Sequence, residues 1–252
     1  MKFIFGNLKL AIGSMLVALA VALYAPAQQS SSTASTTTAS AAPQSNAALE
    51  SILSRMDATA AAFRTAQADF VWKQYQKVVD ETDSQTGKVY FRRHGKDMEM
   101  AAEISSPDTK FVLFADGKVD VYQPRIEQVT RYNAGKDRET FESFLVLGFG
   151  GRGHDLLKSF DVTYEGMENV QGVNTAKIQL VPKSQRVRNI FDRIILWIDP
   201  TRGVSVQQQF FEPSGDYRLA KYSNIQINQK IPDSVFKLKT TSKTKIVSPS
   251  GI

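Results

Sequence analysis

The spacing of apolar residues changes near residue 65. Before that point apolar side chains recur at helical spacing, at Leu49, Ile52, Leu53, Met56, Ala60 and Phe63. This pattern predicts an amphipathic helix of about five turns that starts after an N-cap at Asn46. Further along, short runs of β-branched and aromatic residues alternate with turn residues, which predicts strands. One amphipathic helix ahead of many strands is typical of a helix that lies across a sheet.

The strand region divides into two meanders. We expect about ten or eleven strands, at 70–79, 88–93, 97–104, 111–114, 119–121, 126–132, 160–164, 175–181, 190–198, 203–211 and 217–227, with a last edge strand possible at 237–241. Residues 81–87 are expected to form a turn, and 232–236 a turn or short helix. Because most connections are short, the fold class is mainly β: an antiparallel sheet, curved or nearly closed, with helices available to cover one opening.

A second helical segment separates the two meanders. Phe141, Phe144, Leu145 and Leu147 form the apolar face of a helix expected at 134–147. It ends at the glycine-rich run 148–153, which follows a helix and lacks the lysine of a phosphate-binding loop. A helix cap and hinge is therefore the simpler interpretation of the glycines. A short helix is expected at 154–159.

The first 27 residues show the three-part pattern of a secretory signal. Lys2 and Lys9 accompany the apolar run 10–25, and small residues suited to cleavage follow at 25–27. We expect a cleaved signal peptide at 1–27, with a retained membrane anchor as the alternative. Residues 28–46, rich in Ser, Thr, Ala and Gln, predict a disordered linker. The folded domain is expected at 47–241, followed by a flexible tail at 242–252.

Composition narrows the function. The absence of cysteine excludes disulfides, thiolate metal sites, cysteine nucleophiles and the lipid attachment of a lipoprotein signal. Loss of Lys2 and Lys9 on cleavage would lower the formal charge from +6 to +4. The other basic residues are dispersed among acidic ones, which disfavours a nucleic-acid partner and leaves transient contact with an anionic membrane surface open. The expected location is the periplasm.

Polar residues give little indication of catalysis. His94 and His154 each lie beside a glycine without metal-ligand spacing, and we expect both to be solvated turn residues. A catalytic triad is not excluded in principle, because triads assemble in space, but no nucleophile elbow occurs. Carboxylates that could pair for glycoside hydrolysis lie in turns or on polar strand faces. We expect no enzyme activity, no metal and no cofactor.

Large apolar residues predict a ligand cavity. A single curved sheet has no second sheet to fill its inside, so the helices must cover it, and movable helices would close an apolar ligand site. Met98 and Met100 would suit variable chains, because thioethers repack readily. For each residue taken singly, an ordinary core position is the alternative. The apolar residues expected to contact the ligand are Phe63, Phe70, Trp72, Phe91, Met98, Met100, Phe111, Leu113, Phe144 and Trp197.

The order of several motifs resembles the LolA-type periplasmic carriers of outer-membrane lipoproteins. The most similar stretch is 111–118 (FVLFADGK) with the residues that follow it to Thr130. The segment 87–93 (GKVYFRR) is similar to the strand that ends in the family's functional arginine. A helix ending Phe63-Arg64, the segment 196–203 (LWIDPTRG) and the segment 231–238 (IPDSVFKL) match other family elements. The resemblance spans residues 48–241.

This resemblance implies an incomplete antiparallel barrel with a helical lid over an apolar cavity. The cargo would be the acyl chains of lipoproteins, received from an inner-membrane lipoprotein-releasing ABC transporter and passed to an outer-membrane acceptor. Arg93 would be the arginine that hydrogen-bonds lid carbonyl groups when the carrier is empty; the alternative is a surface arginine paired with a carboxylate. A guanidinium at an apolar mouth must find acceptors, so it can latch a lid. One covered mouth gives no need for a dimer, and we expect a monomer.

The chain departs from the family after Arg93. His94 replaces the family's proline, and Met98 and Met100 stand near its aromatic positions. These changes leave the cargo open. The alternative function is a periplasmic sensor module of the same fold that binds lipid or lipoprotein and signals through a partner, and an enzyme acting on lipid or glycan comes third.

Overall fold

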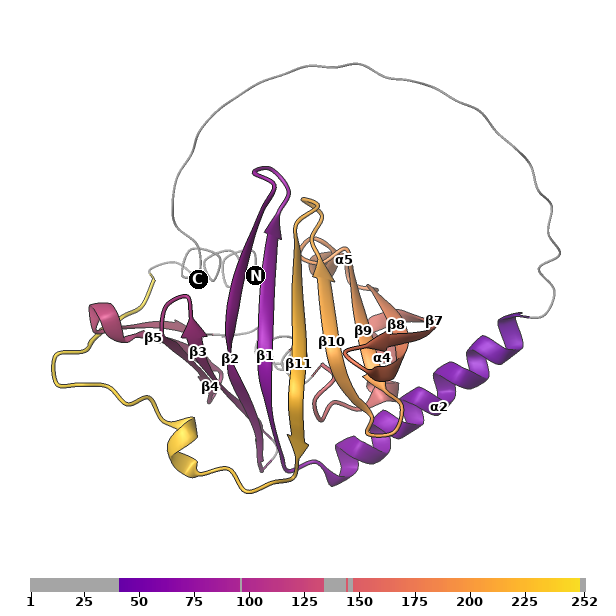
Figure 1. The fold of residues 1–252 in the computed structure, drawn as a ribbon, viewed down its shortest axis with the longest axis horizontal. Coiled ribbons are helices and arrows are strands. Elements are labelled where there is room, and N and C mark those ends of the chain that lie inside the picture. Colours follow the sequence, from indigo (N-terminus) through magenta and orange to yellow (C-terminus); the bar gives the residue numbers. More distant parts are fainter. Residues whose placement is uncertain (1–40, 96, 134–143, 145–146, 250–252) are drawn as a thin grey trace, which may run out of the picture.

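The computed structural model describes residues 41–95, 97–133, 144 and 147–249. A single sheet of twelve strands dominates this part of the chain (Figure 1). Its strands are β1 (Thr65–Gln76), β2 (Glu81–His94), β3 (Asp97–Ser106), β4 (Lys110–Ala115), β5 (Lys118–Gln123), β6 (Gln128–Asn133), β7 (Phe160–Val170), β8 (Val173–Pro182), β9 (Arg193–Asp199), β10 (Val204–Phe211), β11 (Tyr217–Ile227) and β12 (Lys245–Val247).

The strands lie in the order β12-β6-β5-β4-β3-β2-β1-β11-β10-β9-β8-β7. Every pair of neighbours is antiparallel except β12 and β6, which are parallel. The sheet curls strongly but does not close, because β12 and β7 form its two edges (Figure 1). The predicted fold class, a mainly β, incomplete and curved antiparallel barrel, is therefore confirmed.

The described residues contain few helices. They are α2 (Ala41–Ala62), α4 (Gly153–Ser159), α5 (Gln185–Arg188) and two 3-10 turns, η1 (Pro124–Ile126) and η3 (Asp233–Phe236). Helix α2 contacts α4 and β7, and its apolar stripe (Ile52, Leu53, Met56) is buried against β8 and β9. Two glycines allow this close approach, because a Cβ on Gly153 would lie 2.4 Å from the Leu53 carbonyl oxygen and one on Gly203 would lie 2.7 Å from the Arg55 carbonyl oxygen.

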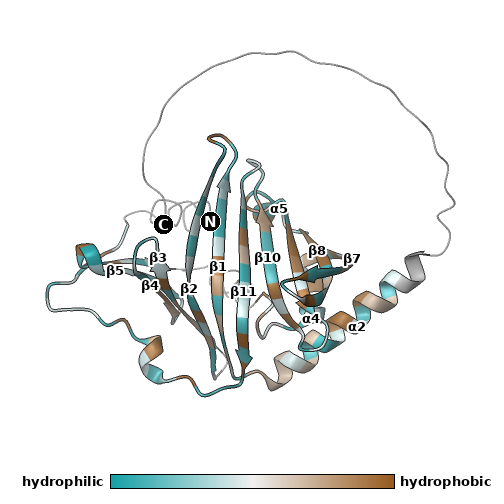
Figure 2. Ribbon diagram, in the orientation of Figure 1, coloured by the Kyte–Doolittle hydropathy of each residue, from teal (hydrophilic) through white to brown (hydrophobic). Residues whose placement is uncertain are grey.

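Several expected boundaries were wrong. β2 begins at Glu81, where a turn was expected, because residues 81–87 pair with β1 although they lack apolar alternation. This N-terminal end of β2 is mostly hydrophilic in Figure 2. Helix α2 begins at Ala41, so Asn46 lies inside it and 41–46 are not a linker. The final strand is 245–247, not 237–241, and it lies in the expected tail.

Other predictions were confirmed or lie outside the described residues. The short helices expected at 154–159 and 232–236 are α4 and η3. The signal peptide predicted at 1–27 and the linker up to residue 40 lie outside the described part. So does most of the helix predicted at 134–147, of which only Phe144 and Leu147 are described.

Candidate ligand-binding site

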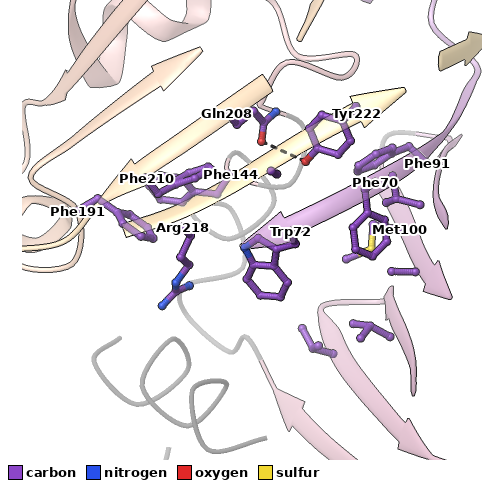
Figure 3. Close-up of a pocket in the computed structure, with 15 residues that line it drawn as sticks. Phe70, Trp72, Phe91, Met100, Phe144, Phe191, Gln208, Phe210, Arg218 and Tyr222 are labelled. Atoms are coloured by element: carbon purple, nitrogen blue, oxygen red, sulfur yellow. Dashed lines mark hydrogen bonds between the residues drawn. The ribbon is translucent and has the colours of Figure 1, made fainter. Parts of the chain in front are cut away.

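An apolar cavity of about 260 Å³ lies on the inner face of the sheet (Figure 3). Cross-strand register builds this face, because paired residues share one side of a sheet. Phe210 pairs with Arg218, Ala220 pairs with Trp72 and Phe91 pairs with Met100. The residues that line the cavity are Phe70, Trp72, Val89, Phe91, Met100, Ala102, Val112, Val119, Phe144, Phe191, Gln208, Phe210, Arg218, Ala220 and Tyr222.

Five of the ten apolar residues predicted to contact a ligand line this cavity: Phe70, Trp72, Phe91, Met100 and Phe144. Phe63 and Met98 belong to the buried cluster beside it, which also contains Phe70 and Phe91. These seven residues therefore lie together on one face, and their contact with a ligand stays a prediction.

The other three lie on the outer face, where they cannot reach the cavity. Phe111 stacks on Tyr122 at a ring distance of 6.2 Å, and Leu113 packs against the cluster formed by Ala101, Ile231 and Phe236. Trp197 packs with Val170, Ile195 and Val206. Strand alternation shows that neighbours point to opposite faces but does not say which face is inner. In addition, β9 is buried on both faces, so Trp197 carries no alternation signal.

Sequence reasoning missed much of the wall contributed by β10, β11 and the segment before β9. The residues predicted to contact a ligand do not include Phe191, Gln208, Phe210, Arg218 and Tyr222, which line the cavity. Alternation along β11 places Arg218, Ala220 and Tyr222 on one face. The pairing of β1 with β11, more than 140 residues apart, brings that face to Trp72, and no local pattern indicates it.

The glycine-rich segment lies against the cavity wall. Residues 147–150 are all buried, which contrasts with the predicted hinge. Phe149 stacks on Phe91 at 5.1 Å between ring centroids and meets Tyr222 edge-on at 4.9 Å. Gly150 adopts φ +81°, and a Cβ there would lie 2.7 Å from the Phe63 ring. Glycine is therefore required at this position both by conformation and by space.

Arg93 holds this segment. Its Nη2 donates a hydrogen bond to the Gly150 carbonyl oxygen at 3.1 Å, and its guanidinium lies 5.9 Å from the centre of the Phe63 ring. The Arg93 backbone N–H donates to the Arg64 carbonyl oxygen at 2.8 Å, which fixes the end of β2 beside the end of α2. Within the described part of the chain, Arg93 thus pairs with a carbonyl, as the resemblance implied, and with no carboxylate.

Three polar side chains line the cavity. The Tyr222 hydroxyl donates to Gln208 Oε1 at 3.4 Å, and Gln208 Nε2 donates to the Leu147 carbonyl oxygen. Burial raises the pKa of Tyr222 above its ordinary value, so the phenol stays neutral. Arg218 forms an ion pair with Glu212 at 3.0 Å. The wall is otherwise apolar.

The two histidines differ from each other. His94 is 76% exposed, as expected, but it is the last residue of β2 and not part of a turn. His154 is not a solvated turn residue: its Nδ1 lies 2.7 Å from Asp57 Oδ2 and its Nε2 lies 3.1 Å from Glu50 Oε1, which joins α4 to α2. Hydrogen bonds to these carboxylates raise the pKa of His154. The described residues contain no cluster of three metal-ligating side chains.

A curved open sheet with an apolar inner cavity defines a binding protein for lipid-like ligands, and comparison with known proteins agrees. The family model for the outer membrane lipoprotein carrier protein LolA matches residues 61–239. The chain belongs to this family, whose fold is that of a binding and carrier protein. Proteins of this family act outside the cytoplasm. No helix within the described residues has the length and hydropathy to span a membrane.

Solved structures that are similar to this chain share little sequence with it. An uncharacterized conserved protein from Thermus thermophilus has 13% identity and a TM-score of 0.50, and the match covers 80% of this chain and 99% of that one. MucB has 12% identity and a TM-score of 0.50, over 76% of this chain and 63% of MucB. The Mycobacterium tuberculosis lipoprotein LppX has 13% identity and a TM-score of 0.46, over 75% and 99%. No curated protein matches the chain.

Proposed function

We propose that this protein carries the acyl chains of lipoproteins across the periplasm, from an inner-membrane ABC transporter to an outer-membrane acceptor. The observation that supports this most is the combination of an apolar cavity with a neighbouring segment, 147–150, whose Gly150 carbonyl accepts a hydrogen bond from Arg93. Membership of the LolA family supports the same class of cargo. The cavity wall offers aromatic and thioether groups, which adapt to chains of different shape.

The proposed mechanism is an exchange of contacts. In the closed state, Phe149 packs on Phe91 and Tyr222, and Arg93 donates to Gly150. An entering acyl chain would replace Phe149 against these rings, and the Arg93 guanidinium would then turn to other acceptors. Because the apolar area lost by Phe149 is regained by the cargo, the net free energy of loading stays small. A carrier needs this balance in order to release its cargo.

The identity of the cargo is tested by purifying the mature protein from its native envelope and analysing the bound molecules by mass spectrometry. Recovery of triacylated lipoproteins is the expected result. Recovery of phospholipid without lipoprotein, together with a stable complex with a partner protein, would overturn the carrier and favour a lipid-sensing module. An empty cavity in every preparation would count against both.

The role of Arg93 is tested by comparing it with its neighbour Arg92. Arg92 lies on the outer face, in contact with Glu99 and Asp233, so Arg92→Leu is a matched control. Arg93→Leu should accept cargo and release it poorly, because the closed state loses its hydrogen bond and no longer competes with the cargo. Transfer of a lipoprotein to acceptor-containing vesicles measures this, and equal transfer by both variants would contradict the latch.

A further inference from the structure

One charged side chain lies in the cavity wall with a hydrogen-bonding atom unused. Arg218 is 9% exposed, and its guanidinium lies 5.8 Å from the centre of the Phe191 ring. Its Nη2 contacts Glu212 Oε1 at 3.0 Å, and the two side chains are 11% and 9% exposed. Its Nε is buried and has no hydrogen-bond partner. A donor in this position lacks the acceptor that buried groups normally find.

The strand register places this donor at one end of the cavity. Arg218 pairs with Phe210 near the turn between β10 and β11, beside Phe191. Figure 3 shows Phe70, Phe91 and Met100 grouped at the other end, away from Arg218, with Tyr222 beside Phe91. Among the described lining residues, the charged side chain therefore lies at one end and uncharged side chains lie along the rest, which matches a chain with a single polar group at its head.

Two other polar side chains of the wall already have partners. Tyr222 donates to Gln208, and Gln208 donates to Leu147. Among the described lining residues, Arg218 Nε is thus the buried donor that has no partner. Leaving such a group unpaired is unfavourable by about 1–3 kcal/mol, which is the same as about 5- to 150-fold in binding. A ligand that supplies an acceptor at this place removes the penalty.

The charge of the pair decides which acceptor fits. Glu212 already opposes the charge of Arg218 at 3.0 Å. A ligand carboxylate beside Nε would place a second negative charge close to Glu212 in a buried site, where like charges raise the free energy steeply. A neutral carbonyl oxygen accepts the same hydrogen bond and adds no charge.

We propose that the cavity selects acyl chains joined through a neutral ester or amide carbonyl, that this oxygen accepts a hydrogen bond from Arg218 Nε, and that Glu212 disfavours free fatty acids. This inference rests on the proposed function, in which the cavity binds acyl chains. Arg218 and Glu212 would then set the head-group specificity, whereas Arg93 holds the cover of the empty state.

The test is displacement of the neutral fluorescent probe N-phenyl-1-naphthylamine from the full mature protein at neutral pH. The competitors are methyl hexadecanoate, hexadecanoic acid and hexadecane, which share a chain and differ in the head. The ester should displace the probe at a concentration about tenfold lower than the acid or the hydrocarbon. If all three bind equally well, head selection fails and the proposed function stands. If neither the probe nor any chain binds, both fail.

Variants of the pair give a sharper result. Glu212→Gln removes the opposing charge and is nearly isosteric, so the acid should now bind at least as well as the ester. The double variant Arg218→Leu with Glu212→Leu leaves no unpaired buried charge; it should bind the ester and hydrocarbon equally. Arg193→Leu is the matched control, because Arg193 stacks at 3.9 Å on Phe211 on the outer face. An unchanged ester preference in Glu212→Gln and in the double variant would overturn the proposal.

Discussion

The two halves of the inner face differ in what covers them. Over β8 and β9, helix α2 fills the space, and Leu53, Ile178, Leu180, Leu196 and Ile198 are each at most 1% exposed. Over β1 to β5, Phe149 packs on Phe91, and the cavity opens between half-buried side chains such as Trp72, Met100 and Val112. The same curved sheet is thus a packed core on one side and a binding wall on the other.

This difference shows that the helix α2 packs against one half of the inner face and leaves the other half for a ligand. A fully buried aliphatic side chain contributes about 1.5–3 kcal/mol by leaving water, so the half covered by α2 supplies much of the stability. Trp72 and Met100 of the other half contribute less to the fold, because they keep part of their surface open. That open surface is the one that a ligand could cover.

Breaking the filled half should give the largest effect. Leu53→Ala removes a side chain that is 1% exposed and leaves a void between α2 and the sheet. We expect the free energy of unfolding to fall by about 2–5 kcal/mol, measured by urea unfolding followed by circular dichroism. Probe binding in the cavity should persist where the protein remains folded. A loss below that of a cavity-wall variant would contradict the comparison.

The boundary between the halves should be the next most sensitive. Gly150→Ala meets the Phe63 ring and must adopt φ +81°. We expect a loss of about 1–3 kcal/mol in the free energy of unfolding. Gly172→Ala is the matched control, since Gly172 has φ +82° but nothing within 4 Å of its added Cβ. The additional loss in Gly150→Ala over Gly172→Ala measures the cost of the clash with the Phe63 ring. Equal losses would mean that the Phe63 ring can move aside without cost.

The cavity half should respond least to truncation. Met100 lines the cavity and is only half-buried, so Met100→Ala enlarges a space that already exists. We expect the free energy of unfolding to fall by under about 1 kcal/mol, while the affinity for N-phenyl-1-naphthylamine changes severalfold. Stability falling as much as in Leu53→Ala would show that the cavity wall is an ordinary core.

The sequence predicts the filled half better than the boundary. The helical spacing of Leu49 to Phe63 and the alternation along the strands suffice to predict α2 and the sheet, because both are local patterns. The inner face was assigned correctly where several neighbouring strands agree, as for Phe91 and Met100, and wrongly for Phe111, Leu113 and Trp197. Arg218 and Glu212 gave no signal at all. Their meaning depends on the long-range pairing of β11 with β1 and on burial, which a local pattern does not contain.

The smallest expected effect is a pH dependence of the contact between α2 and α4. Hydrogen bonds to Asp57 and then to Glu50 raise the folded-state pKa of His154 above 6.5, with Arg152 also facing Asp57 at 3.8 Å. A raised folded-state pKa means that protonated His154 stabilises the fold fully below pH 6.5, and that this contribution is lost as the pH rises through the folded-state value.

The free energy of unfolding should therefore decrease between pH 6 and pH 8.5 in the wild-type protein and stay flatter in His154→Gln. Partial burial raises the pKa of Asp57, but hydrogen bonds from His154 outweigh this effect and lower it. The stabilisation that Asp57 contributes is therefore lost only at acid pH, below 3.8. His94→Gln is the control, because the chain has two histidines and His94 is 76% exposed. The same pH slope in both variants would show that the filled half holds α4 without the help of this histidine.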